Sequence, residues 1–164
     1  MNDRVTVIWA REPIPAGPSV FLAGPTPRDA DTPSWRPAAI AAIEAHWQGP
    51  GPLLVLAPET GGGLRESDYD DQVDWEVAGL DSASAILFWI PRDIRRLPGF
   101  TTNVEFGLYA RSGRVVLGCP PDCPNPERNR YLVSTARRYG VPVIENLTDT
   151  VTSALAVVGA ASAR

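Results

Sequence analysis

Glu105 is the residue of this chain whose type and position most clearly suggest chemistry. It lies in the run Thr101-Thr102-Asn103-Val104-Glu105-Phe106-Gly107, at the start of a helix predicted over residues 103–111. A carboxylate in the first turn lies at the positive end of the helix dipole, which favours its ionised form. An ionised carboxylate in a cleft is suited to covalent attack on a sugar carbon. The spacing of Thr102 and Glu105 also matches a capping box, in which both side chains accept hydrogen bonds from backbone N–H groups. The sequence fits either interpretation.

A second group of carboxylates lies on the helix predicted over residues 67–81. Its apolar positions, at about 100° per residue, predict a buried stripe of Val73, Val77 and Leu80. One border of that stripe carries the aspartates Asp70, Asp74 and Asp81. Asp70 and Asp74 repel each other across one helical turn. The border is therefore either a solvated acidic face or a place where one aspartate is kept protonated to act as an acid. Glu76 lies on the other border.

Ten alternating elements must position these carboxylates. The predicted strands cover residues 19–23, 53–57, 84–90, 114–118 and 141–144, and the predicted helices cover 34–47, 67–81, 103–111, 129–139 and 147–158. The strands are unbroken apolar runs, which is typical of parallel strands buried on both faces. We therefore predict a single α/β domain with a doubly wound, five-stranded parallel sheet, Rossmann-like or flavodoxin-like. Residues 1–18 are predicted to be an N-terminal strand or arm preceding a domain over 19–164, and Pro142 places the last strand at a sheet edge.

Ligands of such sheets bind at the carboxyl ends of the strands, so three loops are expected to form the site: 24–27, 58–63 and 91–102. Gly24 and Pro25 end the first strand, where a glycine allows close approach of a ligand or simply makes a tight turn. The glycines at 61–63 predict a flexible segment able to close over the site. Phe21 and Trp89 are placed either to stack on a base or to pack in the core.

Composition excludes several kinds of chemistry. All 15 basic residues are arginine, which excludes a Schiff-base lysine, and the single histidine, His46, excludes a multi-histidine metal site. Cys119 and Cys123 have no further ligands around them and are predicted to be free thiols. We expect no cofactor and no metal. The net charge of -4 without a basic stretch argues against a nucleic acid polymer as partner, and the absence of a long apolar run predicts a cytoplasmic protein without a membrane partner.

Four motifs in this order resemble the nucleoside 2-deoxyribosyltransferase family, and most closely its transferase-like bacterial branch. They are Val20-Phe21-Leu22-Ala23-Gly24-Pro25, Asp74-Trp75-Glu76, Ala85-Ile86-Leu87-Phe88-Trp89-Ile90-Pro91 and Thr102-Asn103-Val104-Glu105-Phe106-Gly107. The resemblance extends over residues 19–158 by the order of elements. It implies a cofactor-independent enzyme acting on the N-glycosidic bond of a (deoxy)nucleoside or nucleotide. The alternative is a non-catalytic nucleotide-binding or sensing module on the same fold.

The resemblance also assigns roles to residues. Glu105 matches the nucleophile that holds the sugar as an ester, and Asp74 matches the aspartate that assists the leaving base, with Asp70 or Glu76 as alternative matches. Substrate contacts are implied for Phe21, Gly24, Pro25, Asp70, Trp89, Thr102 and Asn103.

Two departures from the family pattern leave transfer and hydrolysis equally open. Phe21 stands where many members have a tyrosine, and an aspartate that holds the 5′ hydroxyl is missing before Thr102, with Asp93 as a distant substitute. Family members are oligomers, and residues 129–131 resemble the segment that reaches into a neighbour. A homo-oligomer, dimer or higher, with Asn129 near the substrate is therefore expected.

Overall fold

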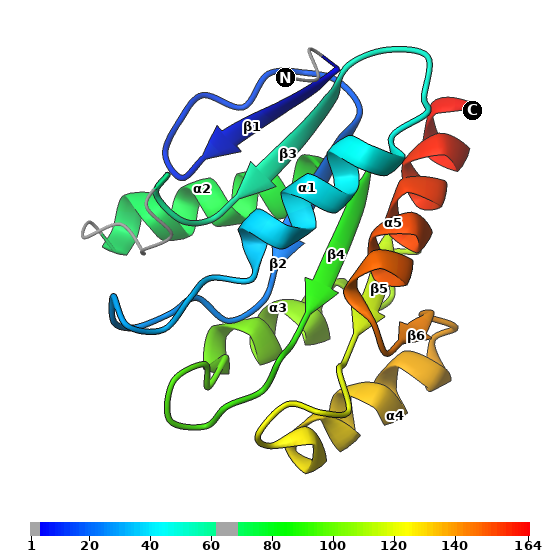
Figure 1. Cartoon of the computed structure of the whole chain (residues 1–164). Coiled ribbons are helices and arrows are strands. Elements are labelled where there is room, and N and C mark those ends of the chain that lie inside the picture. Colours follow the sequence, from blue (N-terminus) through cyan, green and yellow to red (C-terminus); the bar gives the residue numbers. More distant parts are fainter. Residues whose placement is uncertain (1–3, 62–68) are drawn as a thin grey trace.

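The computed structural model describes residues 4–61 and 69–164, and within them the chain forms one parallel sheet (Figure 1). The strands are β1 (Val5–Trp9), β2 (Ser19–Ala23), β3 (Leu53–Ala57), β4 (Ala85–Trp89), β5 (Val115–Gly118) and β6 (Val143–Ile144). Their order is β1-β3-β2-β4-β5-β6, and every neighbouring pair is parallel. The predicted fold class is confirmed, and β6, which follows Pro142, lies at an edge as expected.

The sheet has six strands, where the apolar runs predicted five. The additional strand is β1, which pairs with β3 from Val5 opposite Leu53 to Trp9 opposite Ala57. Only one residue of β1, Ile8, is fully buried. The strand lies at the sheet edge, where half of its surface faces away from the core, so its sequence lacks the unbroken apolar character of the central strands.

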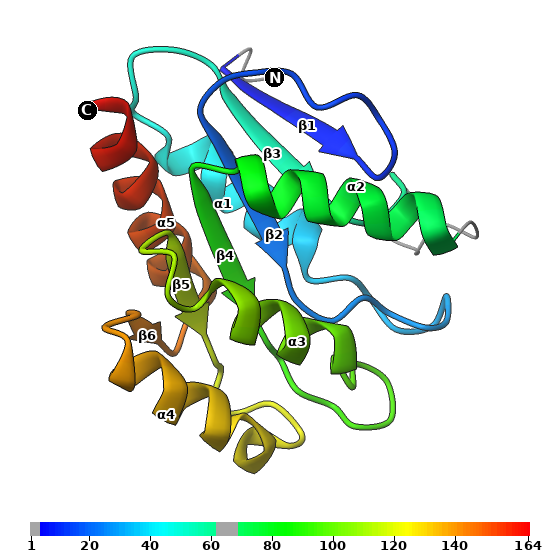
Figure 2. The same ribbon diagram turned by 180° about the vertical axis from the view of Figure 1, so that it is seen from behind.

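Helices cover both faces of the sheet (Figures 1 and 2). On one face lie α1 (Arg36–His46) and α5 (Leu147–Ser162), and on the other lie α2 (Tyr69–Ser82), α3 (Phe100–Tyr109) and α4 (Arg130–Arg138), the last preceded by the 3₁₀ turn η1 (Pro126–Asn129). None of the described helices is long and apolar enough to cross a membrane.

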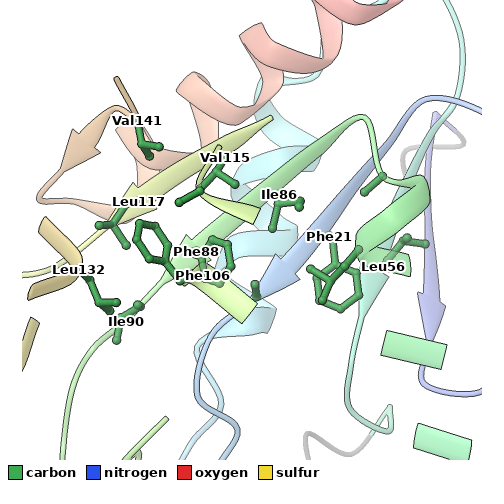
Figure 3. Packing of buried hydrophobic residues seen from close by; sticks show 14 of the residues in the cluster. Phe21, Leu56, Ile86, Phe88, Ile90, Phe106, Val115, Leu117, Leu132 and Val141 are labelled. Carbon is green, nitrogen blue, oxygen red and sulfur yellow. The ribbon is translucent and has the colours of Figure 1, made fainter. Parts of the chain in front are cut away.

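Alternate residues of each central strand supply two separate cores. From β2, Phe21 and Ala23 pack with the helices α2, α3 and α4, whereas Val20 and Leu22 pack with α1 and α5. Figure 3 shows the first of these cores, in which Phe88 meets Phe106 edge to face with ring centroids 5.2 Å apart. Burial of both faces explains why the sequence of these strands is apolar throughout.

The side on which the chain adds successive strands to the sheet changes between β2 and β4, while all strands stay parallel. From β2 the chain passes through α1 to β3 on one side, and then returns through α2 to β4 on the other side of β2. The loops that follow β2 and β4 therefore diverge at their carboxyl ends and leave a crevice between them, which is where open α/β sheets bind ligands.

Two local predictions were wrong. The buried face of α2 consists of Gln72, Trp75, Glu76, Gly79 and Leu80, while Val77 is 47% exposed. The prediction counted only apolar residues, so it missed Gln72 and Glu76, the two polar side chains that this helix buries. Gly79 is also part of the buried face, since a Cβ there would lie 2.8 Å from the ring of Phe21.

The second error concerns the start of α3. The helix begins at Phe100, earlier than predicted, after Gly99 in a left-handed conformation with φ 64°, and no side chain caps it. Thr102 is therefore the third helical residue, the capping box is not formed, and Glu105 lies in the second turn. The capping explanation for Glu105 is removed, and so is the argument that the helix end alone keeps its carboxylate ionised.

Candidate active site

A cavity of about 540 Å³ opens at the carboxyl ends of β2, β3 and β4. Its walls are the loop 24–28 after β2, Pro58 after β3, and residues 98–102 at the end of the loop after β4 and the start of α3. Each of the three loops expected from the sequence contributes to it, the second through Pro58. Of the glycines 61–63, predicted to close over the site, residues 62 and 63 lie outside the described residues. Four charged residues take part in the lining: Arg28 at the end of the first loop, Arg36, Glu76 and Glu105.

Arg36 holds the wall formed by the loop after β2. Its guanidinium is fully buried at the first residue of α1 and donates hydrogen bonds to the carbonyl oxygens of Leu22 (3.1 Å) and Gly24 (2.9 Å) and to the hydroxyl of Thr26 (3.0 Å). Burial lowers the pKa of Arg36, and the negative charges of nearby carboxylates oppose that effect. The side chain remains protonated, as arginine does in proteins.

Glu59 supplies the main counter-charge for this arginine. Its Oε2 lies 2.8 Å from Nη1 of Arg36, and both residues are almost completely buried. Ser34 donates its hydroxyl proton to the same carboxylate, at 2.9 Å from Oε1. A buried ion pair of this kind persists when the remaining hydrogen-bonding positions of both groups are also satisfied, as they are here.

Glu105 and Glu76 bring two further carboxylates to the cavity. Glu105 projects from α3 and is partly exposed, whereas Glu76 projects from α2 and is 8% exposed. Both lie near enough to Arg36 for their negative charges to raise its pKa. The two carboxylates and the arginine therefore lie within electrostatic reach of one another.

Gln72 positions Glu76. Its amide nitrogen donates to Oε1 of Glu76 at 2.7 Å and to the carbonyl oxygen of Pro58 at 3.1 Å. The amide oxygen of Gln72 is buried and, among the described residues, has no hydrogen-bond partner. Gln72 thus ties α2 to the β3 wall and fixes one oxygen of Glu76.

Arg92 holds the opposite wall, formed by the loop after β4. Its guanidinium is buried and donates to the carbonyl oxygens of Pro98 and Gly99, to the amide oxygen of Asn103 (2.7 Å), and to the amide oxygen of Asn129 (2.9 Å). Asn129 in turn donates to the carbonyl oxygen of Ile90 at 3.1 Å. Burial lowers the pKa of Arg92.

Residues 17–123 match the protein-family model described as "Nucleoside 2-deoxyribosyltransferase like", and these residues contain β2 to β5 and the whole lining of the cavity. The chain belongs to this family. No curated protein matches it. Membership in the nucleoside 2-deoxyribosyltransferase-like family supports an enzyme of this kind, with a nucleoside-type substrate.

Four of the site residues predicted from the sequence line the cavity: Gly24, Pro25, Thr102 and Glu105. A side chain at position 24 would overlap the carbonyl oxygen of Trp89, so the turn there requires glycine. Thr102 is 3% exposed, and its position in the first turn of α3 places it one turn before Glu105.

The other predicted residues lie elsewhere. Phe21 and Trp89 belong to the two cores and do not line the cavity, and Asp70 and Asp74 are exposed on α2. Asp93 accepts hydrogen bonds from the backbone N–H groups of Arg95 and Arg96, which shapes its own loop. Asn103 and Asn129 hold Arg92 in place.

Arg36 and Glu59 were not identified from the sequence, although one signal was available. A cation at the first residue of a helix faces the positive end of the helix dipole, which is unfavourable without a specific partner. Arg36 occupies that position and is followed by the apolar run Pro37-Ala38-Ala39-Ile40. Its partner Glu59 follows β3, at a distance along the chain that only the sheet order explains.

Proposed function

We propose that this chain cleaves or transfers the N-glycosidic bond of a (deoxy)nucleoside or nucleotide, with Glu105 as the nucleophile. One observation carries the proposal. In a member of this family, Glu105 lines a cavity at the crevice between β2 and β4, beside a buried arginine and a second carboxylate. The ionised carboxylate of Glu105 is the form that attacks carbon, and Arg36 lies within electrostatic reach of it.

The reaction has two steps in this proposal. A Glu105 oxygen attacks C1′ of the sugar, the bond from C1′ to the base nitrogen breaks, and the departing base takes its electron pair and receives a proton from an acidic side chain. Water or a second base then attacks C1′, the ester bond to Glu105 breaks, and the acceptor loses a proton to the same side chain. Water gives hydrolysis and a base gives transfer.

Glu76 is our candidate for the acidic side chain. The resemblance pointed first to Asp74, but Asp74 is exposed and outside the cavity lining, whereas Glu76 is buried and lines it. The two residues lie on different faces of α2, so the pair Glu76→Gln and Asp74→Asn separates the two assignments. We expect the larger loss of turnover, roughly 10²-fold or more, in Glu76→Gln. A larger loss in Asp74→Asn would return the role to Asp74.

The decisive experiment uses Glu105→Gln, which keeps the shape of the side chain and removes its charge. The purified protein is incubated with ribonucleosides, deoxyribonucleosides and their 5′-monophosphates, with and without a second free base, and free base and new nucleoside are measured by chromatography. We expect base release by the wild type and a loss of roughly 10³-fold or more in the variant. Glu145→Gln, which changes an exposed glutamate between β6 and α5, is the matched control.

Intact-mass measurement of acid-quenched reactions tests the covalent step. The wild type should gain the mass of one sugar, and the modified peptide should contain Glu105. Base release that is unchanged in Glu105→Gln would rule out the nucleophile. Binding of a nucleotide by the wild type, without any product in any reaction, would instead favour the non-catalytic binding or sensing module.

A further inference from the structure

A second cavity, of about 490 Å³, lies beyond the carboxyl end of β5 and shares no lining residue with the Glu105 cavity. One wall consists of Cys119, Pro120 and Pro121, which follow β5, and of Pro126, the first residue of η1. The other wall is the first two turns of α4 with Asn129, and includes Arg130, Val133, Ser134 and Arg137. Three prolines fix the backbone of the loop wall, so the cavity is preformed.

The α4 wall is positively charged. Arg130, Ser134 and Arg137 are spaced by four and three residues, which places them on one face of the helix. Among the described residues, neither Arg130 nor Arg137 has an acidic partner, and no aspartate or glutamate lines this cavity. The nearest acid along the chain, Glu127, lies 3.7 Å from Arg128. Two exposed arginines therefore line the cavity without an acidic partner among the described residues.

The remaining lining does not offset that charge. Burial raises the pKa of Cys119 to about 12, so its thiol is neutral near pH 7. Both ends of the Asn129 amide are engaged, with Arg92 and with Ile90. Val133 and the prolines present apolar surface. The cavity thus combines two free cationic side chains and a hydroxyl with an apolar wall.

We propose that this second cavity is a binding site for a small organic anion, whose acidic group is held by Arg130 and Arg137 and whose apolar part rests on Pro120, Pro121 and Val133. Guanidinium groups bind phosphates and carboxylates through paired N–H groups, and Ser134 adds a hydroxyl donor between them. The site does not depend on the reaction proposed for Glu105.

The test measures binding to the full chain by isothermal titration calorimetry, with phenyl phosphate, benzoate and phenol as probes of matched ring size. We expect phenyl phosphate to bind and phenol not to bind. The double substitution Arg130→Gln/Arg137→Gln should weaken phenyl phosphate binding about tenfold or more, because both charge-assisted contacts are lost. Arg138→Gln, which changes an exposed arginine of α4 outside the cavity lining, is the matched control and should bind as the wild type does.

Each result bears on the proposal. Binding of phenyl phosphate alone identifies phosphorylated ligands, and binding of benzoate as well identifies organic acids in general. No binding of either anion, equal binding of phenol, or unchanged affinity in the double variant would overturn the proposal. Because calorimetry needs no turnover, it gives an answer even if Glu105→Gln proves to have full activity. Circular dichroism of the double variant checks that it remains folded.

Discussion

Two buried arginines hold the two walls of the Glu105 cavity, and they do so in different ways. Arg36 fixes the loop after β2 and is paired with the buried carboxylate of Glu59 at 2.8 Å. Arg92 fixes the loop after β4, and its hydrogen-bond partners among the described residues are all uncharged: two backbone carbonyls and the side-chain amides of Asn103 and Asn129. Both guanidiniums are at most 2% exposed.

This difference shows where charge is needed in the site. The Arg36 wall faces Glu76 and Glu105, so its ion pair lies within electrostatic reach of the two carboxylates that we assign to chemistry. The Arg92 wall has a positioning task only, and neutral acceptors are sufficient for it. One arginine side chain holds each loop by hydrogen bonds, but only Arg36 also forms an ion pair.

The two walls should differ most in the free energy of unfolding that is lost when each arginine is replaced with methionine. Arg36→Met leaves Glu59 as a buried carboxylate without its cation, and we expect a loss of about 3–5 kcal/mol in the free energy of unfolding. Arg92→Met leaves only neutral acceptors unsatisfied, with an expected loss of about 1–3 kcal/mol. Urea unfolding measures both values. Arg36→Met/Glu59→Leu should recover part of the loss, and equal losses in the two single variants would contradict the comparison.

A smaller difference is expected from a methyl group added to each wall. In Gly24→Ala the new Cβ overlaps the Trp89 carbonyl oxygen, which belongs to a central strand and cannot move, so we expect a loss of about 2–4 kcal/mol. In Gly99→Ala the Cβ lies 2.9 Å from Nη1 of Arg92, and the left-handed φ of 64° adds about 1 kcal/mol. The melting temperature of Gly24→Ala should therefore be lower than that of Gly99→Ala. Gly107→Ala, where a Cβ meets nothing within 4 Å, is the control.

The smallest effect concerns Cys119, the group beside Arg92 that would become its counter-ion if it ionised. Burial raises the pKa of this thiol from 9.0 to about 12. The folded state therefore binds the proton more tightly than the unfolded state, and this contribution to stability is present below about pH 9 and is lost as the pH rises towards 12. At pH 8 in a Cys123→Ser background, iodoacetamide should label Cys119 much more slowly than in urea. Rapid labelling of the folded protein would mean a thiolate, and hence an ion pair at Arg92.

The sequence predicted the frame of the molecule well and the site only in part. Unbroken apolar strands predicted the parallel sheet, and the loops at their ends predicted where the cavity lies. Both cysteines are free thiols, as predicted. The predictions for α2 and α3 failed for different reasons. In α2, Glu76 is buried at a polar cavity and Gln72 is buried against Glu76 and Pro58, which an apolar periodicity does not detect. The helix α3 begins after a left-handed glycine instead of a side-chain cap.

The roles of single residues depended on contacts between distant segments. Arg36 and Glu59 meet because β2 and β3 are neighbours in the sheet, and Arg92 and Asn129 meet because α4 packs beside the loop after β4. The position of Arg36 at the start of a helix is a local signal, but no local pattern identifies the partner of either arginine. Phe21 and Trp89 could be placed near the strand ends from the sequence, but only the packing of α2 and of α1 with α5 shows that they belong to the cores.

The hydrogen bond between Arg92 and Asn129 also determines how long a segment must be transplanted to carry the intact site into another protein. The residues that identify the family end at 123, yet Asn129 lies beyond them and fixes the arginine that supports Pro98 and Gly99. A chimera that transplanted only residues 17–123 would carry every cavity-lining residue and still lack one support of the cavity wall. Transfer of this site to another scaffold therefore requires η1, with Asn129, to be included.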